Sequence, residues 1–172
     1  PIKRRVAVKM LREEFLQNEE LLNRFRFEQK AQAALNHPNV VRIHDAGESD
    51  ARQPFLVMEL LNGNSITTHC EQQNLSILKR LDLFLDVCKG VEHAHQRGIV
   101  HRDLKPANML VTEENEVTIA KVIDFGIATA TEDFEITKTE ITQSGQFVGT
   151  CAYMSPEQFL SSKDVDTRSD IF

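Results

Sequence analysis

The sequence has few cysteines, no long apolar run and no surplus of basic residues. Its three cysteines, Cys70, Cys88 and Cys151, are far apart and form no Cys-x-x-Cys pair, which indicates reduced cytosolic thiols rather than a disulfide framework or a zinc site. No apolar stretch approaches the roughly 20 residues that cross a bilayer. The given residues show no signal-peptide pattern, but the chain opens with Pro1 rather than Met, so we expect that the native N-terminus is missing. The net charge of −6 argues against sequence-independent binding of nucleic acid. We therefore expect a cytoplasmic domain with no nucleic-acid partner and no membrane segment in this window, and a membrane tether elsewhere in a longer protein stays open.

What is present predicts a mixed chain of strands and helices. The first sixty residues predict a strand at 5–9, a helix, and two further strands at 40–44 and 54–59, followed by an Asn-Gly-Asn turn at 62–64. The apolar face of that helix carries Leu21, Phe25 and Leu35. We therefore expect a small sheet with one amphipathic helix.

The second half predicts a long helix, a hairpin and a loop. Apolar residues recur at helical spacing between about residues 76 and 97, and Gly98 follows as a stop signal. The expected apolar stripe of this helix is Ile77, Leu81, Phe84, Cys88 and Val91. Strands at 109–111 and 117–123, with a turn at 113–116, predict a hairpin. Residues 128–146 are polar and rich in threonine, which predicts a long loop.

Three oxygen-bearing side chains are expected to converge near this hairpin. Asp103 and Asn108 share the loop before the hairpin strand at 109–111, and Asp124 follows the hairpin strand at 117–123. The hairpin should therefore put Asp124 beside Asn108. Hard oxygen ligands of this kind suit Mg²⁺ held together with phosphate oxygens. Lys105 adds a positive charge on the same loop.

An ion pair is expected in the first half of the chain. Glu28 falls on the apolar face of the first helix, where an unpaired carboxylate is costly. Lys9 lies in an apolar strand and has the same need, so the two residues are expected to pair.

Four short motifs follow one another along the chain in the order of a known signature set. They are Val-Ala-Val-Lys at 6–9, His-Arg-Asp-Leu-Lys-Pro-Ala-Asn at 101–108, Asp-Phe-Gly at 124–126 and Ser-Pro-Glu at 155–157. Together they resemble a eukaryotic-like serine/threonine protein kinase domain of the bacterial type. The resemblance implies an α+β, two-lobed protein-kinase fold, truncated at both ends. Residues 1–61 would be a partial small lobe and residues 62–172 a partial large lobe with the catalytic loop and activation segment.

The resemblance also implies a role for individual residues, with ATP and Mg²⁺ as cofactors. Asp103 would orient the substrate hydroxyl and accept its proton, and Lys105 would stabilise the transferred phosphoryl group. Asn108 and Asp124 would hold Mg²⁺. The residues implied in ATP binding are Lys9, Glu28, Ala7, Met58, Glu59, Leu61 and Leu110. The residues implied in structural support are His101, Arg102, Phe125, Gly126, Thr150, Glu157 and Asp170.

Substrates and regulation follow from the same resemblance. Lys105, with Thr150 before Tyr153, resembles kinases that phosphorylate serine and threonine in proteins. Arg102 would pair with a phosphate on the activation segment, and Thr142 and Ser144 are the expected phosphorylation sites. A homodimer that phosphorylates itself in trans is a further expectation. Ser155 replaces the commoner alanine of its motif.

Two other functions stay open. One is a non-catalytic scaffold or pseudokinase-like binding module, and the other is a small-molecule phosphotransferase with a related fold. Intact Lys9, Glu28, Asp103, Asn108 and Asp124 favour an active kinase. The glycine-rich loop of this family would lie roughly twenty residues before Lys9, ahead of Pro1. The chain is therefore expected to be a fragment that is inactive when expressed alone.

Overall fold

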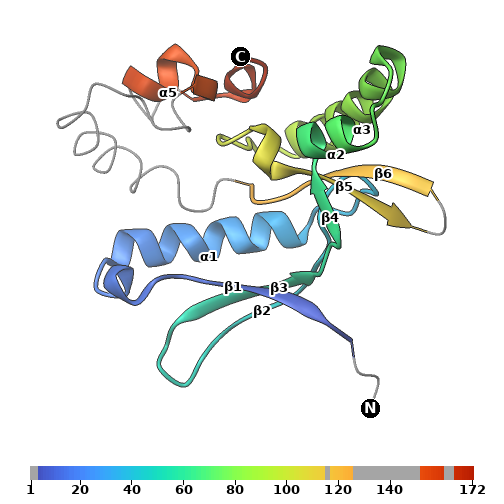
Figure 1. Ribbon diagram of the computed structural model, residues 1–172. Helices are drawn as coiled ribbons and strands as arrows, with labels where there is room; N and C mark the ends of the chain where they lie inside the picture. Colours follow the sequence, from blue (N-terminus) through green and yellow to red (C-terminus); the bar gives the residue numbers. More distant parts are fainter. Residues whose placement is uncertain (1–3, 115–116, 126–151, 161–164) are drawn as a thin grey trace, which may run out of the picture.

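The computed structural model of the chain describes residues 4–114, 117–125, 152–160 and 165–172 (Figure 1). Within these ranges the strands form two three-stranded sheets. The strands are β1 (Val6–Met10), β2 (Ile43–Glu48), β3 (Pro54–Glu59), β4 (Gly63–Ser65), β5 (Met109–Glu114) and β6 (Val117–Val122). The helices are α1 (Glu19–Ala33), α2 (Ile66–Gln72), α3 (Ile77–His95) and α5 (Pro156–Leu160). None of the described helices is both long and apolar enough to cross a membrane.

The first sheet has the strand order β1-β3-β2, and α1 lies along it (Figure 1). All pairs are antiparallel, with Ala7 opposite Met58 and Lys9 opposite Leu56. The Asn18 side chain caps α1 by accepting a hydrogen bond from the Leu21 backbone nitrogen, which satisfies one of the free donors at the start of the helix. The helix buries Phe25 against the sheet. The strands predicted at 5–9 and 54–59 and the amphipathic helix are confirmed, with small shifts of their ends.

The strand predicted at 40–44 is wrong in position. β2 begins at Ile43 and runs to Glu48, through Asp45 and Gly47, which are poor strand formers. Pairing with the apolar strand β3 overrides that local preference. Val40 instead forms a single parallel bridge with Val122 of the other sheet.

The second sheet has the strand order β4-β5-β6. The turn predicted at 62–64 is wrong, because Gly63 and Asn64 lie in β4 and pair with β5. Gly63 allows this close pairing, since an added Cβ would lie 2.0 Å from the Val111 carbonyl oxygen. Helix α2 was not expected from the sequence. It starts after Ser65, whose side chain accepts a hydrogen bond from the Thr68 nitrogen.

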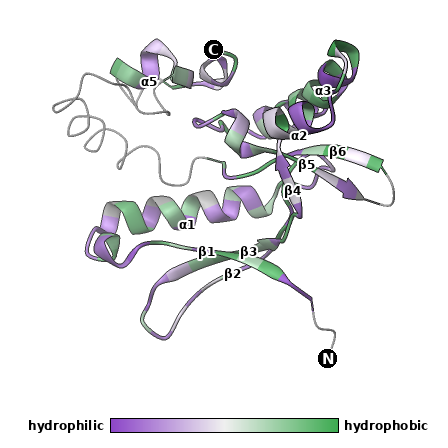
Figure 2. Ribbon diagram, in the orientation of Figure 1, coloured by the Kyte–Doolittle hydropathy of each residue, from purple (hydrophilic) through white to green (hydrophobic). Residues whose placement is uncertain are grey.

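The long helix was predicted, but with the wrong buried face. The buried residues of α3 are Leu83, Val87, Gly90, Val91 and Ala94. Most of the expected stripe faces outward among the described residues; Ile77 is 76% exposed, and Leu81 and Phe84 are about half exposed. Hydrophobic and hydrophilic residues are mixed along α3 (Figure 2), and its apolar residues include both buried ones, such as Leu83, and exposed ones, such as Phe84. The small residue Gly90 decides the choice, because an added Cβ would lie 2.5 Å from the Asn39 carbonyl oxygen.

The apolar residues form two clusters that meet close to Asp124. One cluster lies between α1 and the first sheet, and the other lies between α3 and the β5–β6 hairpin. Ile123 packs against the first cluster, whereas Val122 and Phe125 belong to the second. The Asn39 side chain ties the segment after α1 to β6 by donating to the Ala120 carbonyl oxygen at 2.9 Å. The end of β6 is therefore held from both sides.

Candidate active site

The β5–β6 hairpin places Asn108 next to Asp124. Met109 pairs with Val122 at the end of the hairpin, and the Ile123 nitrogen donates to the Asn108 carbonyl oxygen at 2.9 Å. The hairpin expected from the sequence is confirmed, although β5 continues to Glu114 through part of the expected turn. Residues 115–116 lie outside the described part of the chain.

Asp103 is held by its neighbours on the same loop. The Asn108 Nδ2 atom donates to the Asp103 carbonyl oxygen at 2.8 Å and to its Oδ2 atom at 2.9 Å. Lys105 Nζ lies 2.9 Å from the same Oδ2 atom. No described residue bonds Oδ1 of Asp103, so that oxygen is left to receive a proton. Asn108 likewise keeps its amide oxygen for another partner, because its nitrogen is used by Asp103.

Asp124 lies beside Lys9, which comes from the other sheet. Lys9 Nζ donates to Oδ1 of Asp124 at 3.0 Å, and both side chains are about one-third exposed. The backbone of Asp124 is in the left-handed region, with φ of 54°, which is a strained conformation for a residue other than glycine. Glu28 lies in α1, but its side chain is outside the described part of the structure. The Lys9–Glu28 pair therefore stays a prediction.

His101 is fully buried and supports the loop. The Asp103 nitrogen donates to His101 Nδ1 at 3.2 Å, so Nε2 carries the proton and donates to the Ile123 carbonyl oxygen at 3.0 Å. Its ring packs on Phe125, with centroids 4.7 Å apart. Burial lowers the pKa of His101, and this outweighs the raising effects of the Ile123 carbonyl and the nearby carboxylates. The ring is therefore neutral at pH 7 and has a packing role.

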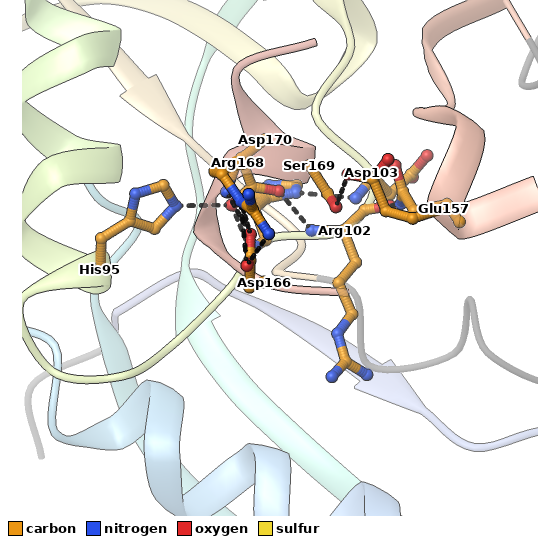
Figure 3. A network of polar contacts seen from close by, with 10 residues as sticks. His95, Arg102, Asp103, Glu157, Asp166, Arg168, Ser169 and Asp170 are labelled. Atoms are coloured by element: carbon orange, nitrogen blue, oxygen red, sulfur yellow. Dashed lines mark hydrogen bonds and ion pairs between the residues drawn. The ribbon is translucent and has the colours of Figure 1, made fainter. Parts of the chain in front are cut away.

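Asp170 anchors the backbone of the loop at residues 101–108 (Figure 3). Its Oδ2 atom accepts from the His101 nitrogen, and its Oδ1 atom accepts from the Arg102 nitrogen, both at 2.7 Å. His95 at the end of α3 donates from Nε2 to Oδ2, also at 2.7 Å. The sequence did not single out His95. Its partner lies 75 residues further along the chain, and no local pattern indicates such a contact.

Arg102 is held at both ends of its backbone. It has φ of 67°, again in the left-handed region. Asp170 accepts from its nitrogen, and Gln158 Nε2 donates to its carbonyl oxygen at 2.5 Å. Its guanidinium group extends away from this network (Figure 3), and within the described residues no carboxylate pairs with it. The side chain is therefore available to a partner from elsewhere.

Ser155 and Gln158 form a reciprocal cap at the start of α5. The Gln158 nitrogen donates to Ser155 Oγ at 3.4 Å, and the Ser155 nitrogen donates to Gln158 Oε1 at 3.0 Å. This is a capping box, and the Ser-x-x-Gln spacing was its signal in the sequence. The serine that replaces the commoner alanine thus has a structural reason. Glu157, between them, accepts a hydrogen bond from Ser169 Oγ at 2.5 Å, and this bond is the main reason that its pKa is lowered.

The residues expected around the adenine come from both sheets. Met58 is buried in the first cluster, and Ala7 and Leu61 pack against that cluster. Leu110 lies in β5. Glu59 ends β3, and its carboxylate binds Lys121 Nζ at 3.0 and 3.1 Å. This largely buried pair was not expected from the sequence.

Part of the predicted site lies outside the described residues. Gly126, Thr142, Ser144, Thr150 and Cys151 all fall in the range 126–151. The expected long loop at 128–146 falls there too. Cys70 is buried and Cys88 is exposed, and both are free thiols.

The chain has a sheet with one helix along it, joined to a helical part. The helical part carries a loop with Asp103 and Asn108, and Asp124 lies next to that loop. This is the arrangement of a protein kinase. The chain belongs to the protein kinase family, whose domain model matches residues 2–172. The resemblance and the fold class inferred from the motifs are thereby confirmed.

Bacterial serine/threonine kinases are among the similar proteins. Serine/threonine-protein kinase PknA of Mycobacterium tuberculosis is 40% identical over 174 residues, covering 98% of this chain and 38% of that protein. Serine/threonine-protein kinase PknB of Mycolicibacterium smegmatis is 38% identical over 173 residues, covering 98% of this chain and 27% of that protein. The crystal structure of the Mycobacterium tuberculosis PknI kinase domain matches with a TM-score of 0.70 and 29% identity, over 96% of this chain and 58% of that one. The chain thus spans well under half the length of these two curated relatives.

Proposed function

We propose that the protein carrying this chain transfers the γ-phosphoryl group of ATP to serine and threonine hydroxyls of protein substrates. The observation that carries the proposal is the meeting of Asp103, Asn108, Asp124 and Lys9 where the two apolar clusters join. Phosphoryl transfer needs positioning and charge neutralisation more than covalent chemistry. These four side chains supply both.

In this proposal Asp103 orients the substrate hydroxyl and receives its proton. The Oδ2 atom is fixed by Asn108 and Lys105, which leaves Oδ1 to accept from the hydroxyl. Lys105 lies close enough to Asp103 to stabilise negative charge on the transferred group. Lys9 holds the ATP phosphates, and it is positioned for this by the strand pairing of β1 with β3.

The residues present fit a magnesium site that also uses phosphate oxygens. Asn108 contributes an amide oxygen, and Asp124 contributes its Oδ2 atom, which no described residue bonds. In the described part of the chain no three His, Cys, Asp or Glu side chains gather as a metal site. One or two protein oxygens together with substrate phosphates is the usual way that Mg²⁺ is bound. When bound, Mg²⁺ neutralises charge on the β- and γ-phosphates.

The remaining roles belong to the same proposal. Ala7 and Leu110 enclose the adenine, Met58 lies behind it, and the backbone of Glu59 and Leu61 bonds its edge. The division into partial lobes at residues 1–61 and 62–172 is supported by the two separate sheets. Thr142 and Ser144 are the proposed phosphorylation sites, with Arg102 as the receiving cation. The free thiols of Cys70 and Cys88 support a cytoplasmic location.

The test compares two carboxylates in the full-length protein. Asp103→Asn should lower the rate of phosphate transfer to a serine/threonine peptide library by at least about 100-fold, while calorimetry shows nearly unchanged affinity for Mg·ADP. Asp124→Asn should instead weaken Mg·ADP binding by about an order of magnitude or more.

The outcome that contradicts the proposal is equal transfer by wild type and Asp103→Asn. A wild-type protein that binds Mg·ADP but transfers no phosphate would favour the scaffold function. Transfer to small alcohols and not to peptides would favour the small-molecule phosphotransferase.

A further inference from the structure

Three basic side chains follow one another at intervals of four residues near the end of α3. They are Lys89, His93 and Arg97, the last of which lies just beyond the helix. Residues four apart lie on the same side of a helix, so the three define one stripe. Arg97 keeps to this stripe, because its Nη1 atom donates to the His93 carbonyl oxygen at 3.1 Å and lies 3.3 Å from His93 Nδ1. The stripe is basic in a chain whose net charge is −6.

A fourth basic side chain comes from the segment after α1. This segment lies directly on α3, since an added Cβ on Gly90 would lie 2.5 Å from the Asn39 carbonyl oxygen. The contact brings the His37 ring to the His93 ring, with centroids 4.9 Å apart. Two elements that are distant in the sequence therefore meet in one basic patch. The basic patch consists of His37, Lys89, His93 and Arg97.

Both imidazole rings of the basic patch keep an N–H group without an acceptor. The Asn39 nitrogen donates to His37 Nδ1 at 3.2 Å, so the neutral ring has its proton on Nε2. Arg97 donates to His93 Nδ1, so this ring also has its proton on Nε2. Within the described residues no acceptor bonds either Nε2 atom, and that of His93 is buried. Because a buried donor without a partner is costly, the basic patch lacks an acceptor.

The charges around the basic patch favour an anion over a metal ion. Two neighbouring neutral imidazoles are also a pair of ligands for a transition metal. Burial is the main cause that lowers the pKa of His37, and the charges of Lys89 and Arg97 lower it further. The Asp86 carboxylate raises this pKa and is the smallest of these effects. Burial, followed by Arg97 and His37, lowers the pKa of His93. Neighbours that oppose added positive charge make a poor cation site and a good anion site.

The dipole of α3 does not account for the basic patch. Cations are favoured at the last turn of a helix, and Arg97, which bonds a carbonyl of that turn, fits this role. Lys89 lies before the last turn, and His37 lies on another element. Lys89 pairs with Asp86 at 3.0 Å, but its side chain is 61% exposed. An exposed pair of this kind is weak, so Lys89 can exchange it for another anion.

We propose that the basic patch is a binding site for a phosphate group. The Arg97 Nε and Nη2 atoms, which no described residue bonds, suit the two parallel bonds that guanidinium groups make with phosphate. Lys89 adds a positive charge, and His37 Nε2 adds an N–H donor. A phosphorylated serine or threonine side chain of a protein and the free phosphate ion share this chemistry, and the experiment separates the two sources. The inference goes beyond the proposed function, since binding at the basic patch requires no phosphate transfer.

The experiment uses the full-length protein with isotope-labelled histidine, in excess Mg·ADP so that the nucleotide site is occupied. Nuclear magnetic resonance follows the ring signals of His37 and His93, which report binding at the basic patch. The probes are inorganic phosphate, a phosphothreonine peptide and the same peptide without its phosphate. Arg97→Gln is the test variant. Lys79→Gln is the matched control, because it removes one positive charge from the other end of the same helix.

We expect phosphate and the phosphopeptide to shift both ring signals and to raise the pKa of both histidines, since a bound anion favours the charged ring. Arg97→Gln should weaken binding by about tenfold, the size of one charge-assisted hydrogen bond. Lys79→Gln should stay within about twofold of wild type. Binding should be about threefold tighter at about pH 6.5 than at about pH 8, because protonation of the rings is linked to binding of the anion. The double variant His37→Gln, His93→Gln should lose this pH dependence.

Ring signals that respond to no phosphate probe, or equal effects of Arg97→Gln and Lys79→Gln, would overturn the proposal. A response to Zn²⁺ at lower concentration than to phosphate would replace it with a metal site. Tighter binding of the phosphopeptide than of inorganic phosphate would support the site and assign it to phosphorylated proteins, and the reverse order would support it as a site for the free ion. Melting temperatures show whether each variant is folded, and Lys89→Gln gives the same comparison if Arg97→Gln is not.

Discussion

At the scale of single residues, Glu59 joins the first sheet to the second through its side chain. The Glu59 carboxylate accepts from Lys121 Nζ and from the Arg42 backbone nitrogen, the latter at 2.7 Å. Lys121 is only 5% exposed. The Glu59 backbone nitrogen donates to the Arg42 carbonyl oxygen at 2.9 Å, so the proposed function assigns the Glu59 carbonyl oxygen to the adenine. The Glu59–Lys121 pair thus connects the two sheets through side chains.

Breaking this buried pair should be costly. We expect Lys121→Met to lower the free energy of unfolding by about 3–5 kcal/mol, because it leaves the Glu59 carboxylate buried and without its cation. The double variant Lys121→Met, Glu59→Gln should cost less than the sum of the two single changes. Chemical denaturation measures all three.

The exposed pair Arg26–Glu48, 2.6 Å apart, provides the control. Arg26→Met should cost less than about 1 kcal/mol. Equal effects of Arg26→Met and Lys121→Met would contradict the importance of burial at Lys121.

The sequence predicted the motif residues of the site better than its glutamines. Asp103, Asn108 and Asp124 belong to motifs with fixed spacing, and the hairpin that brings them together follows from local patterns. Gln32 and Gln158 act on backbone carbonyls 93 and 56 residues away. Such contacts depend on how close two distant segments approach, and no local pattern encodes that distance.

At the scale of elements, α5 is attached to the catalytic loop by one side chain. Gln158 uses its oxygen to cap α5 and its nitrogen to hold the Arg102 carbonyl. Gln158→Glu keeps the capping oxygen but loses the bond to Arg102. We therefore expect Gln158→Glu to lower kcat by about fivefold to tenfold, the size of one hydrogen bond, with only a small change in melting temperature.

Ser155→Ala is the matched change for the cap alone. It should lower stability by about 0.5–2 kcal/mol and leave kcat close to that of wild type. Steady-state kinetics and thermal denaturation separate the two effects. If both variants lowered kcat equally, the bond to Arg102 would have no separate role.

The elements themselves were predictable in type more often than in orientation. The long helix α3 was expected from its periodicity, but the face with Ile77 and Phe84 was expected inside and lies outside. Both sides of α3 carry apolar residues, so composition alone did not decide. Gly90 decides, because its missing Cβ allows α3 to approach Asn39. Similarly, Gly63 and Asn64 of the expected turn lie in strand β4, because β5 pairs with them.

At the scale of the whole molecule, burial makes the fold sensitive to acid. The pKa values of His37, His44, His93 and His101 are all lowered, in each case chiefly by burial. The His37 and His93 rings lie 4.9 Å apart and join the segment after α1 to α3. A lowered pKa in the folded state means that the unfolded state takes up protons first as pH falls.

The contribution of these histidines to the free energy of unfolding should therefore be complete above about pH 6.5 and decrease below that pH. We expect the denaturant concentration at the midpoint of unfolding to decrease as the pH is lowered from about 7.5 to about 5.5. The double variant His37→Gln, His93→Gln should flatten this decline, since it removes two of the four groups. A decline of the same steepness in that variant would show that other groups cause it.

The anchoring of the catalytic loop by Asp170 has a consequence for synthesis on the ribosome. The carboxylate that fixes the His101 backbone lies 69 residues further along the chain. At roughly 5–20 residues per second, the loop is made several seconds before its anchor. During that interval the β5–β6 hairpin can form, but Arg102 lacks the acceptor that holds its left-handed backbone. The catalytic loop is therefore expected to reach its working shape only after translation has passed Asp170, so a nascent chain stalled earlier should be unable to use ATP.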